Sequence, residues 1–160
     1  MSDDEVDTLL FGSTYTGGAF AEAGDVTQAV LDLTPGQWLA AGGFEEPQPP
    51  VYFNVAGEMP DSLLEPSASA TITMADYSFA IAAGQLTAGP QVIKVENAGS
   101  QPHHIYMGRS TVPLTDADLE TIAINPDEHL SHVVSIQTIS AGNAVWLPIT
   151  LSPGPHVLFC

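Results

Sequence analysis

The stretch AVWLPITLSPGPHVLFC, residues 144–160, has the pattern of two β-strands joined by a turn. From Val145 to Leu151 every second side chain is aliphatic, which is typical of a strand with one buried face. Pro148 predicts an edge or a bulge in this strand, because proline cannot donate to a hydrogen-bond ladder. The letters SPG supply the turn, and the second strand then runs to Cys160.

The rest of the chain extends this β-rich pattern. Strand signals bounded by Gly, Pro or Asn turns occur in residues 71–79, 91–97, 103–107, 144–151 and 155–160. The only helical candidate is residues 115–122, where Thr115 would cap an acidic first turn. Short strands joined by turn residues predict an all-β fold, a β-sandwich.

Composition limits the classes of partner. The 160 residues include two basic and nineteen acidic side chains, for a formal net charge of −17. A charge of this sign excludes nucleic acid and anionic membranes as partners. The chain is 44% apolar, with 14 glycines and 13 prolines, so it is too apolar for a disordered acidic tail and too rich in turn residues for a helical bundle. No apolar run approaches membrane-spanning length, and the acidic N-terminus is unlike a secretory signal.

An internal repeat predicts the domain organisation. Residues 23–36 align with residues 141–154 at a constant offset of 118, with Ala, Gly, Leu and Pro positions identical. The repeat predicts that residues 1–57 are the C-terminal half of a first copy, 58–70 a linker, and 71–160 a second copy. On this interpretation the chain is truncated at both ends. The alternative is a chance likeness between two strand-turn-strand units.

The segment VENAGSQPHHIYM, residues 95–107, holds the first candidate ligand. Because side chains alternate along a strand, His103 is expected on the face that carries Ile105 and Met107. If that face lines the core, His103 points inward, either as a hydrogen-bonded structural residue or as a metal ligand. His104 is expected to point outward beside it, and a one-residue register shift would exchange the two histidines.

Cys160, the single cysteine, is the second candidate ligand. At the end of a strand its sulfur could meet an imidazole from another strand, and sulfur with nitrogen donors suits copper or zinc. The alternative is that Cys160 is a small apolar packing residue. The predicted metal ligands are therefore His103 and Cys160, with His104 as a weaker candidate.

The motif NxG at 97–99 with PH at 102–103, followed by LxPG at 151–154 and a strand ending in Cys160, resembles the cupredoxin (blue copper) family. More narrowly, the chain is similar to bacterial secreted proteins with two plastocyanin-like domains in tandem. The resemblance covers residues 71–160 and, more faintly, 1–57. It implies a Greek-key β-sandwich in which His103 is the first histidine ligand and Cys160 the cysteine ligand of a type 1 copper site.

The resemblance also implies a second histidine and a methionine after the cysteine, whereas the sequence ends at Cys160. The copper site is therefore expected to be incomplete in this chain, and none is expected in the first copy, where Gly42 stands at the cysteine position. Electron transfer with a small redox protein and a periplasmic or extracellular location are what the resemblance implies.

Two other functions stay open. One is a metal-free sandwich used for adhesion or assembly, with self-association through strand edges that truncation leaves exposed. The other is a copper or zinc chaperone that uses His103, His104 and Cys160.

The remaining histidines and motifs favour no other chemistry. Two imidazoles occur in EHLSH, residues 128–132, which is predicted as a solvated loop, and His156 is predicted at the surface or in packing. No Gly-x-Ser-x-Gly elbow, phosphate-binding Gly-rich loop or His-Glu-x-x-His motif occurs in the sequence. The chain is therefore not expected to be an enzyme.

Overall fold

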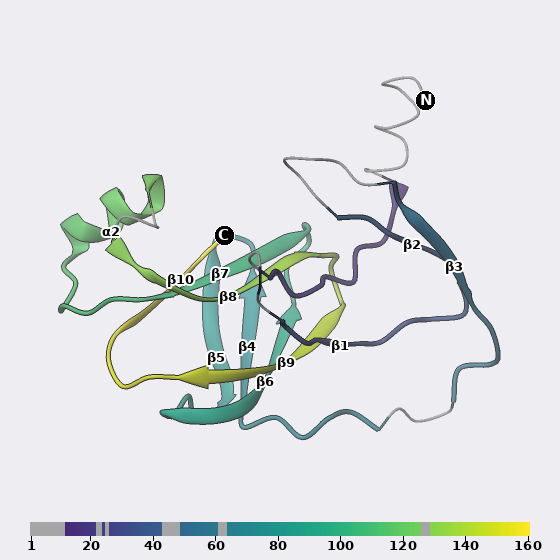
Figure 1. Ribbon diagram of the computed structural model, residues 1–160, viewed down its shortest axis with the longest axis horizontal. Helices are drawn as coiled ribbons and strands as arrows, with labels where there is room; N and C mark the ends of the chain where they lie inside the picture. The colour runs from purple at the N-terminus through teal and green to yellow at the C-terminus, as the bar shows by residue number, and fades with distance from the viewer. Residues whose placement is uncertain (1–11, 22–23, 25, 43–48, 61–63, 126–128) are drawn as a thin grey trace. The chain divides into compact units, whose positions relative to one another are not determined.

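A computed structural model describes residues 12–21, 24, 26–42, 49–60, 64–125 and 129–160 (Figure 1). The chain forms two compact units. The first combines the described residues up to Leu31 with Pro66–Cys160, and the second is Asp32–Glu65.

The first unit is a sandwich of two sheets. The five-stranded sheet has the order β1-β9-β6-β4-β5, and the three-stranded sheet has the order β10-β7-β8. The strands of the larger sheet are β1 (Val30–Leu31), β4 (Ala70–Ala75), β5 (Ser78–Gly84), β6 (Gly89–Asn97) and β9 (Ala144–Leu151). Those of the smaller sheet are β7 (His103–Arg109), β8 (Ser131–Ile139) and β10 (His156–Phe159). The chain passes between the sheets after β6, β8 and β9, and the predicted all-β sandwich is confirmed.

The core lies between the two sheets and follows the predicted alternation. Val145, Leu147, Ile149 and Leu151 of β9 are buried, as are Ile105 and Met107 of β7. Every second side chain of a strand faces the same side, so these residues meet in one hydrophobic cluster.

Pro148 occupies the edge position that its chemistry requires. It is exposed, and β1 pairs only with Val145 and Trp146 of β9. Within the described chain β9 is therefore an edge strand at Pro148, where no donor is needed on the outer side.

Two elements differ from the prediction. The segment 71–79 is not one strand, because Asp76 and Tyr77 form a two-residue turn between β4 and β5. Tyr77 has a positive φ of 66°, which is a turn conformation rather than a strand conformation. Strand β8 was not predicted, and its first two residues, Ser131 and His132, belong to the stretch expected to be a loop.

Helix α2 (Asp116–Ile124) begins where it was expected. The Thr115 N–H and hydroxyl each donate to Asp118 Oδ2 at 2.7 Å, and the Asp118 N–H donates to the Thr115 carbonyl at 3.0 Å. Asp118 is the third residue of the helix, and its side chain and that of Thr115 form a capping box. No helix in the described part of the chain has the length and apolar character needed to span a bilayer.

The N-terminal segment belongs to the sandwich. Thr16 and Ala19 form bridges with Ile139 and Ile136 of β8. Gly17, with a φ of +83°, sits against Ile139, so that a Cβ there would lie 3.0 Å from the Ile139 side chain. This segment covers the edge of β8 that faces away from β7.

The second unit is a hairpin of β2 (Gly36–Ala40) and β3 (Val51–Val55). Trp38 pairs with Phe53 across it. The predicted boundaries therefore differ from the division into units, since the described residues before Asp32 join the sandwich and Ala70, at the end of the predicted linker, is a buried residue of β4. The origin of residues 1–57 as a repeat stays a prediction.

Candidate metal centre

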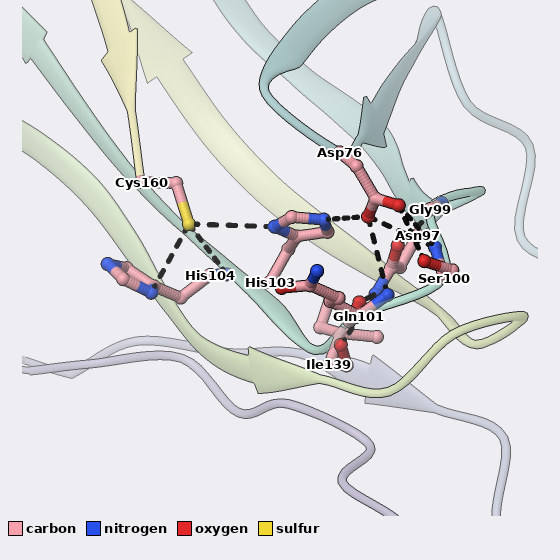
Figure 2. Close-up of polar contacts among 9 residues, drawn as sticks. All are labelled: Asp76, Asn97, Gly99, Ser100, Gln101, His103, His104, Ile139 and Cys160. Atoms are coloured by element: carbon pink, nitrogen blue, oxygen red, sulfur yellow. Dashed lines mark hydrogen bonds and ion pairs between the residues drawn. The ribbon is translucent and has the colours of Figure 1, made fainter.

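The antiparallel pairing of β7 and β10 brings the two predicted ligands together. Strand β7 begins at His103, whereas β10 ends at Phe159, which pairs with Tyr106. Cys160 follows directly, and its Sγ lies 3.8 Å from His103 Nδ1 (Figure 2). The predicted meeting of this imidazole with this sulfur is confirmed, and metal binding by the pair stays a prediction.

His103 has the predicted inward orientation. Its side chain is 14% exposed, and the next residues on the same face, Ile105 and Met107, are buried. His104 is exposed, as its position in the strand predicts. Its Nδ1 nevertheless lies 3.5 Å from Cys160 Sγ, and its backbone N–H donates to the same sulfur at 3.5 Å. The two rings approach the sulfur from different sides (Figure 2).

Asp76 holds the far nitrogen of the His103 ring. Its Oδ1 lies 3.0 Å from His103 Nε2, and its carboxylate also accepts hydrogen bonds from the Ser100 hydroxyl at 2.6 Å and from the Gln101 N–H at 3.3 Å. The Ser100 hydroxyl first, and then the His103 ring and the Ser100 N–H, hold the pKa of Asp76 well below its usual range.

The ionised carboxylate determines the tautomer of His103. A carboxylate without a proton can only accept, so His103 Nε2 carries the hydrogen of their contact. In the neutral ring the other nitrogen, Nδ1, is then an unprotonated acceptor. This nitrogen is the one that lies toward Cys160.

Asn97, the first residue of the NxG motif, shapes the loop before His103. Its side chain is 2% exposed. Its Nδ2 donates to the carbonyls of Gln101 at 2.7 Å and Ile139 at 2.8 Å, and its Oδ1 accepts from the Gly99 N–H at 2.9 Å. The bonds to Gln101 and Gly99 fix the loop that leads into β7, and the bond to Ile139 ties this loop to the end of β8.

The distances suit two donors of one metal ion. Sulfur and nitrogen ligands bind at about 2.3 and 2.0–2.1 Å, so at bond angles of roughly 105–120° they stand about 3.5–3.8 Å apart. Within the described residues, however, no group of three or more His, Cys, Asp or Glu side chains could hold a metal ion. The geometry therefore supplies a donor pair, and Asp76 lies on the other side of the ring.

The other histidines lie apart from this pair. His132 is in β8, where its Nε2 is 2.9 Å from Ser135 Oγ and its ring is 5.2 Å from that of Tyr106, so the loop predicted for this residue is wrong. His129 is exposed, and Glu128 of the same motif lies outside the described residues. His156 Nδ1 contacts the Gly154 carbonyl at 3.0 Å, in agreement with a packing role.

Asp76 is the site residue that the sequence analysis missed. The letters TITMA-DY-SFAIA contain the signal, since two alternating segments flank a pair whose first member is aspartate, a common turn residue. Comparisons of the chain with protein-family models, curated proteins and solved structures found no match.

Proposed function

We propose that this chain is a copper-binding, cupredoxin-like module of an electron-transfer protein, in which His103 and Cys160 supply two ligands of a type 1 site. One observation carries the proposal. His103 Nδ1 lies 3.8 Å from Cys160 Sγ while its other nitrogen is held by a carboxylate. In metal sites a histidine ligand commonly donates the hydrogen of its second nitrogen to a carboxylate, a backbone carbonyl or water, and Asp76 is such a partner.

Copper bound to these donors would supply one-electron chemistry. The chain's own residues hold the donors in place. The backbone N–H of His104 donates to the sulfur, which stabilises negative charge there. Ile105 and Met107, which follow on the inner face of β7, are buried in the core and keep the start of this strand rigid. Donors fixed by a packed sandwich need little rearrangement when the charge of the metal changes.

The location and the partner proposed for this function follow from the family resemblance and from the net charge. We assign the module to a periplasmic or extracellular setting and a small redox protein as its partner. The net charge of −17 would accelerate association with a cationic partner, with a rate that falls as salt is added.

The test is a titration of the full chain with copper(II), with imidazole and a thioether supplied in solution as the remaining donors of the site, followed by absorption in the visible range. We expect an intense thiolate-to-copper band that is lost in Cys160→Ser and in His103→Ala, and is kept in the control His129→Ala. A band that survives Cys160→Ser overturns the thiolate assignment. A wild-type chain that binds no copper overturns the proposal and favours the metal-free adhesion or assembly module.

The second candidate function, a copper or zinc chaperone, is favoured by the short distance between the His104 ring and the Cys160 sulfur. His104 Nδ1 lies 3.5 Å from Cys160 Sγ at an exposed position, where a metal ion could be passed to another protein. This function predicts Cys160-dependent binding of zinc or copper without the intense band, and a stronger loss on His104→Ala than on His103→Ala.

A further inference from the structure

The turn between β4 and β5 reaches across to the loop that precedes His103. Asp76 stands in this turn at the end of the larger sheet, whereas His103 opens β7 in the smaller sheet. The Asp76 carboxylate gathers donors from the whole loop, namely both the N–H and the hydroxyl of Ser100, the N–H of Gln101 and the ring of His103 (Figure 2).

Gly99 provides an independent sign that this contact is built into the fold. A Cβ at residue 99 would lie 2.5 Å from Asp76 Oδ1, 2.9 Å from His103 Nε2 and 3.0 Å from the Asp76 backbone nitrogen. Only glycine allows the loop to approach the turn this closely. The oxygen and the nitrogen that any side chain would disturb are the two atoms of the Asp76–His103 contact.

We propose that Asp76 is the positioning residue of His103, fixing the ring in the orientation and tautomer that leave Nδ1 free to bind a metal beside Cys160. The inference rests on the proposed function for its metal-binding consequence. The orientation itself is a property of the metal-free chain. Without the carboxylate, the ring could turn over or place its hydrogen on Nδ1, and either change removes the lone pair that faces the sulfur.

This role differs from a general contribution to stability. The side chain of Asp76 is 31% exposed, and contacts of partly exposed charges contribute little to folding. In contrast, removal of a group that hydrogen-bonds the second nitrogen of a histidine ligand commonly weakens metal binding 10–100-fold. Removal of the Asp76 carboxylate is therefore expected to change the orientation of the His103 ring and its affinity for a metal ion, with the fold intact.

The first measurement is the tautomer of His103 in the metal-free full chain, read from long-range proton–nitrogen NMR spectra. We expect the Nε2–H form in the wild type and a substantial Nδ1–H population in Asp76→Ala. Asp76→Asn should restore the Nε2–H form, because its oxygen at the Oδ1 position can still accept from the ring while its amide donates to the Ser100 hydroxyl. Glu96→Gln is the matched control. It also removes a carboxylate, but this one accepts a hydrogen bond from the Thr73 hydroxyl and makes none with His103.

The second measurement is the affinity of each variant for Co²⁺, which reports thiolate ligation without oxidising the sulfur. We expect Asp76→Ala to weaken Co²⁺ binding about tenfold or more. The affinity of Asp76→Asn should lie between those of Asp76→Ala and the wild type, and that of Glu96→Gln should equal the wild type. An Nδ1–H tautomer in the wild type, or an unchanged tautomer in Asp76→Ala, overturns the positioning role. A wild type with the Nε2–H form that binds neither Co²⁺ nor Cu²⁺ overturns the proposed function and leaves the positioning role standing.

Discussion

At the scale of single residues, the buried side chain of Asn97 holds the loop before His103 in place, although Asn97 is not a ligand candidate. It is one of two buried polar residues among those described, and its amide joins the loop before His103 to the end of β8. A buried amide group must keep all its partners, because an unpaired carbonyl or N–H in the core costs about 1–3 kcal/mol.

We therefore expect Asn97→Ala to lower the free energy of unfolding by about 2–4 kcal/mol, because three hydrogen bonds of a buried side chain are lost. Urea unfolding followed by fluorescence measures this value. The control is Asn143→Ala, which loses one side-chain bond to the Tyr15 carbonyl and should cost about 1 kcal/mol. Equal losses in the two variants would contradict the role given to Asn97.

Single residues also show which parts of the site could be predicted from the sequence. The orientation of His103 could be predicted because it depends only on strand alternation and on the aliphatic residues that follow. Asp76 could not be assigned to the site, since its contact with His103 joins two sheets and depends on how turn and loop meet. The close approach at Gly99 depends on the same packing, so the sequence alone does not distinguish this glycine from a turn glycine.

At the scale of elements, α2 depends on a cap that is sensitive to acid. The Thr115 hydroxyl, and then its N–H, lower the pKa of Asp118, so the carboxylate is more acidic when folded than when unfolded. Its stabilisation is therefore complete above about pH 4, the ordinary range of a carboxyl group, and is lost as the pH falls through the lower folded value.

We expect amide protection in α2, corrected for intrinsic exchange, to fall as the pH drops below about 4. Hydrogen exchange at Leu119, whose N–H donates to the Thr115 carbonyl, is the measurement. Asp118→Asn should remove this dependence and weaken protection at neutral pH, and Asp116→Asn should leave it. Protection in the wild type that does not change with pH would show that the cap does not hold the helix.

Strand β8 explains why one element escaped prediction. Val134 and Ile136 are buried on alternate positions, but the next fully buried residue is Ile139, so the spacing changes from even to odd. The ladder with β7 is irregular between His103 and Ile105, opposite this change. An irregularity in pairing hides a strand from a test based on strict alternation.

The N-terminal segment acts as a cover for β8, and Gly17 is its most restricted point. We expect Gly17→Ala to lower stability by at least about 1 kcal/mol, because a side chain is strained at its φ and meets Ile139. Exchange at the Gln137 and Ser140 amides, which donate to Gly18 and Tyr15, should accelerate. Gly12→Ala, where a Cβ meets nothing within 4 Å, is the control that should change neither.

At the scale of the whole molecule, the sequence predicted the sandwich but not the division of the chain. Alternation within residues 71–160 identifies most strands of the two sheets. The part before Asp32 joins them through a two-residue strand and isolated bridges, which are too short to leave a pattern. The repeat was inferred from matching residues at a constant offset and the linker from composition, whereas compact units follow from contacts, so the two sets of boundaries differ.

Among the residues that the structure describes, the hydrophobic cluster of the first unit contains only members of that unit, including Ala29 and Leu31 from the N-terminal part. Its stability should therefore not depend on the hairpin unit. Each unit also holds one of the two tryptophans, Trp38 in the hairpin and the buried Trp146 in the sandwich. Fluorescence of Trp146 can thus report the sandwich separately once Trp38 is absent.

We expect replacement of Asp32–Glu65 by a flexible Gly/Ser linker of the same length to leave the urea midpoint of Trp146 fluorescence unchanged. The comparison is with the full chain carrying Trp38→Phe, so that one tryptophan is observed in both proteins. The His103 tautomer should also be the same, because Asp76, Gly99 and His103 all belong to the sandwich. A lowered midpoint would mean that the hairpin stabilises the sandwich through contacts that the division into two units does not contain.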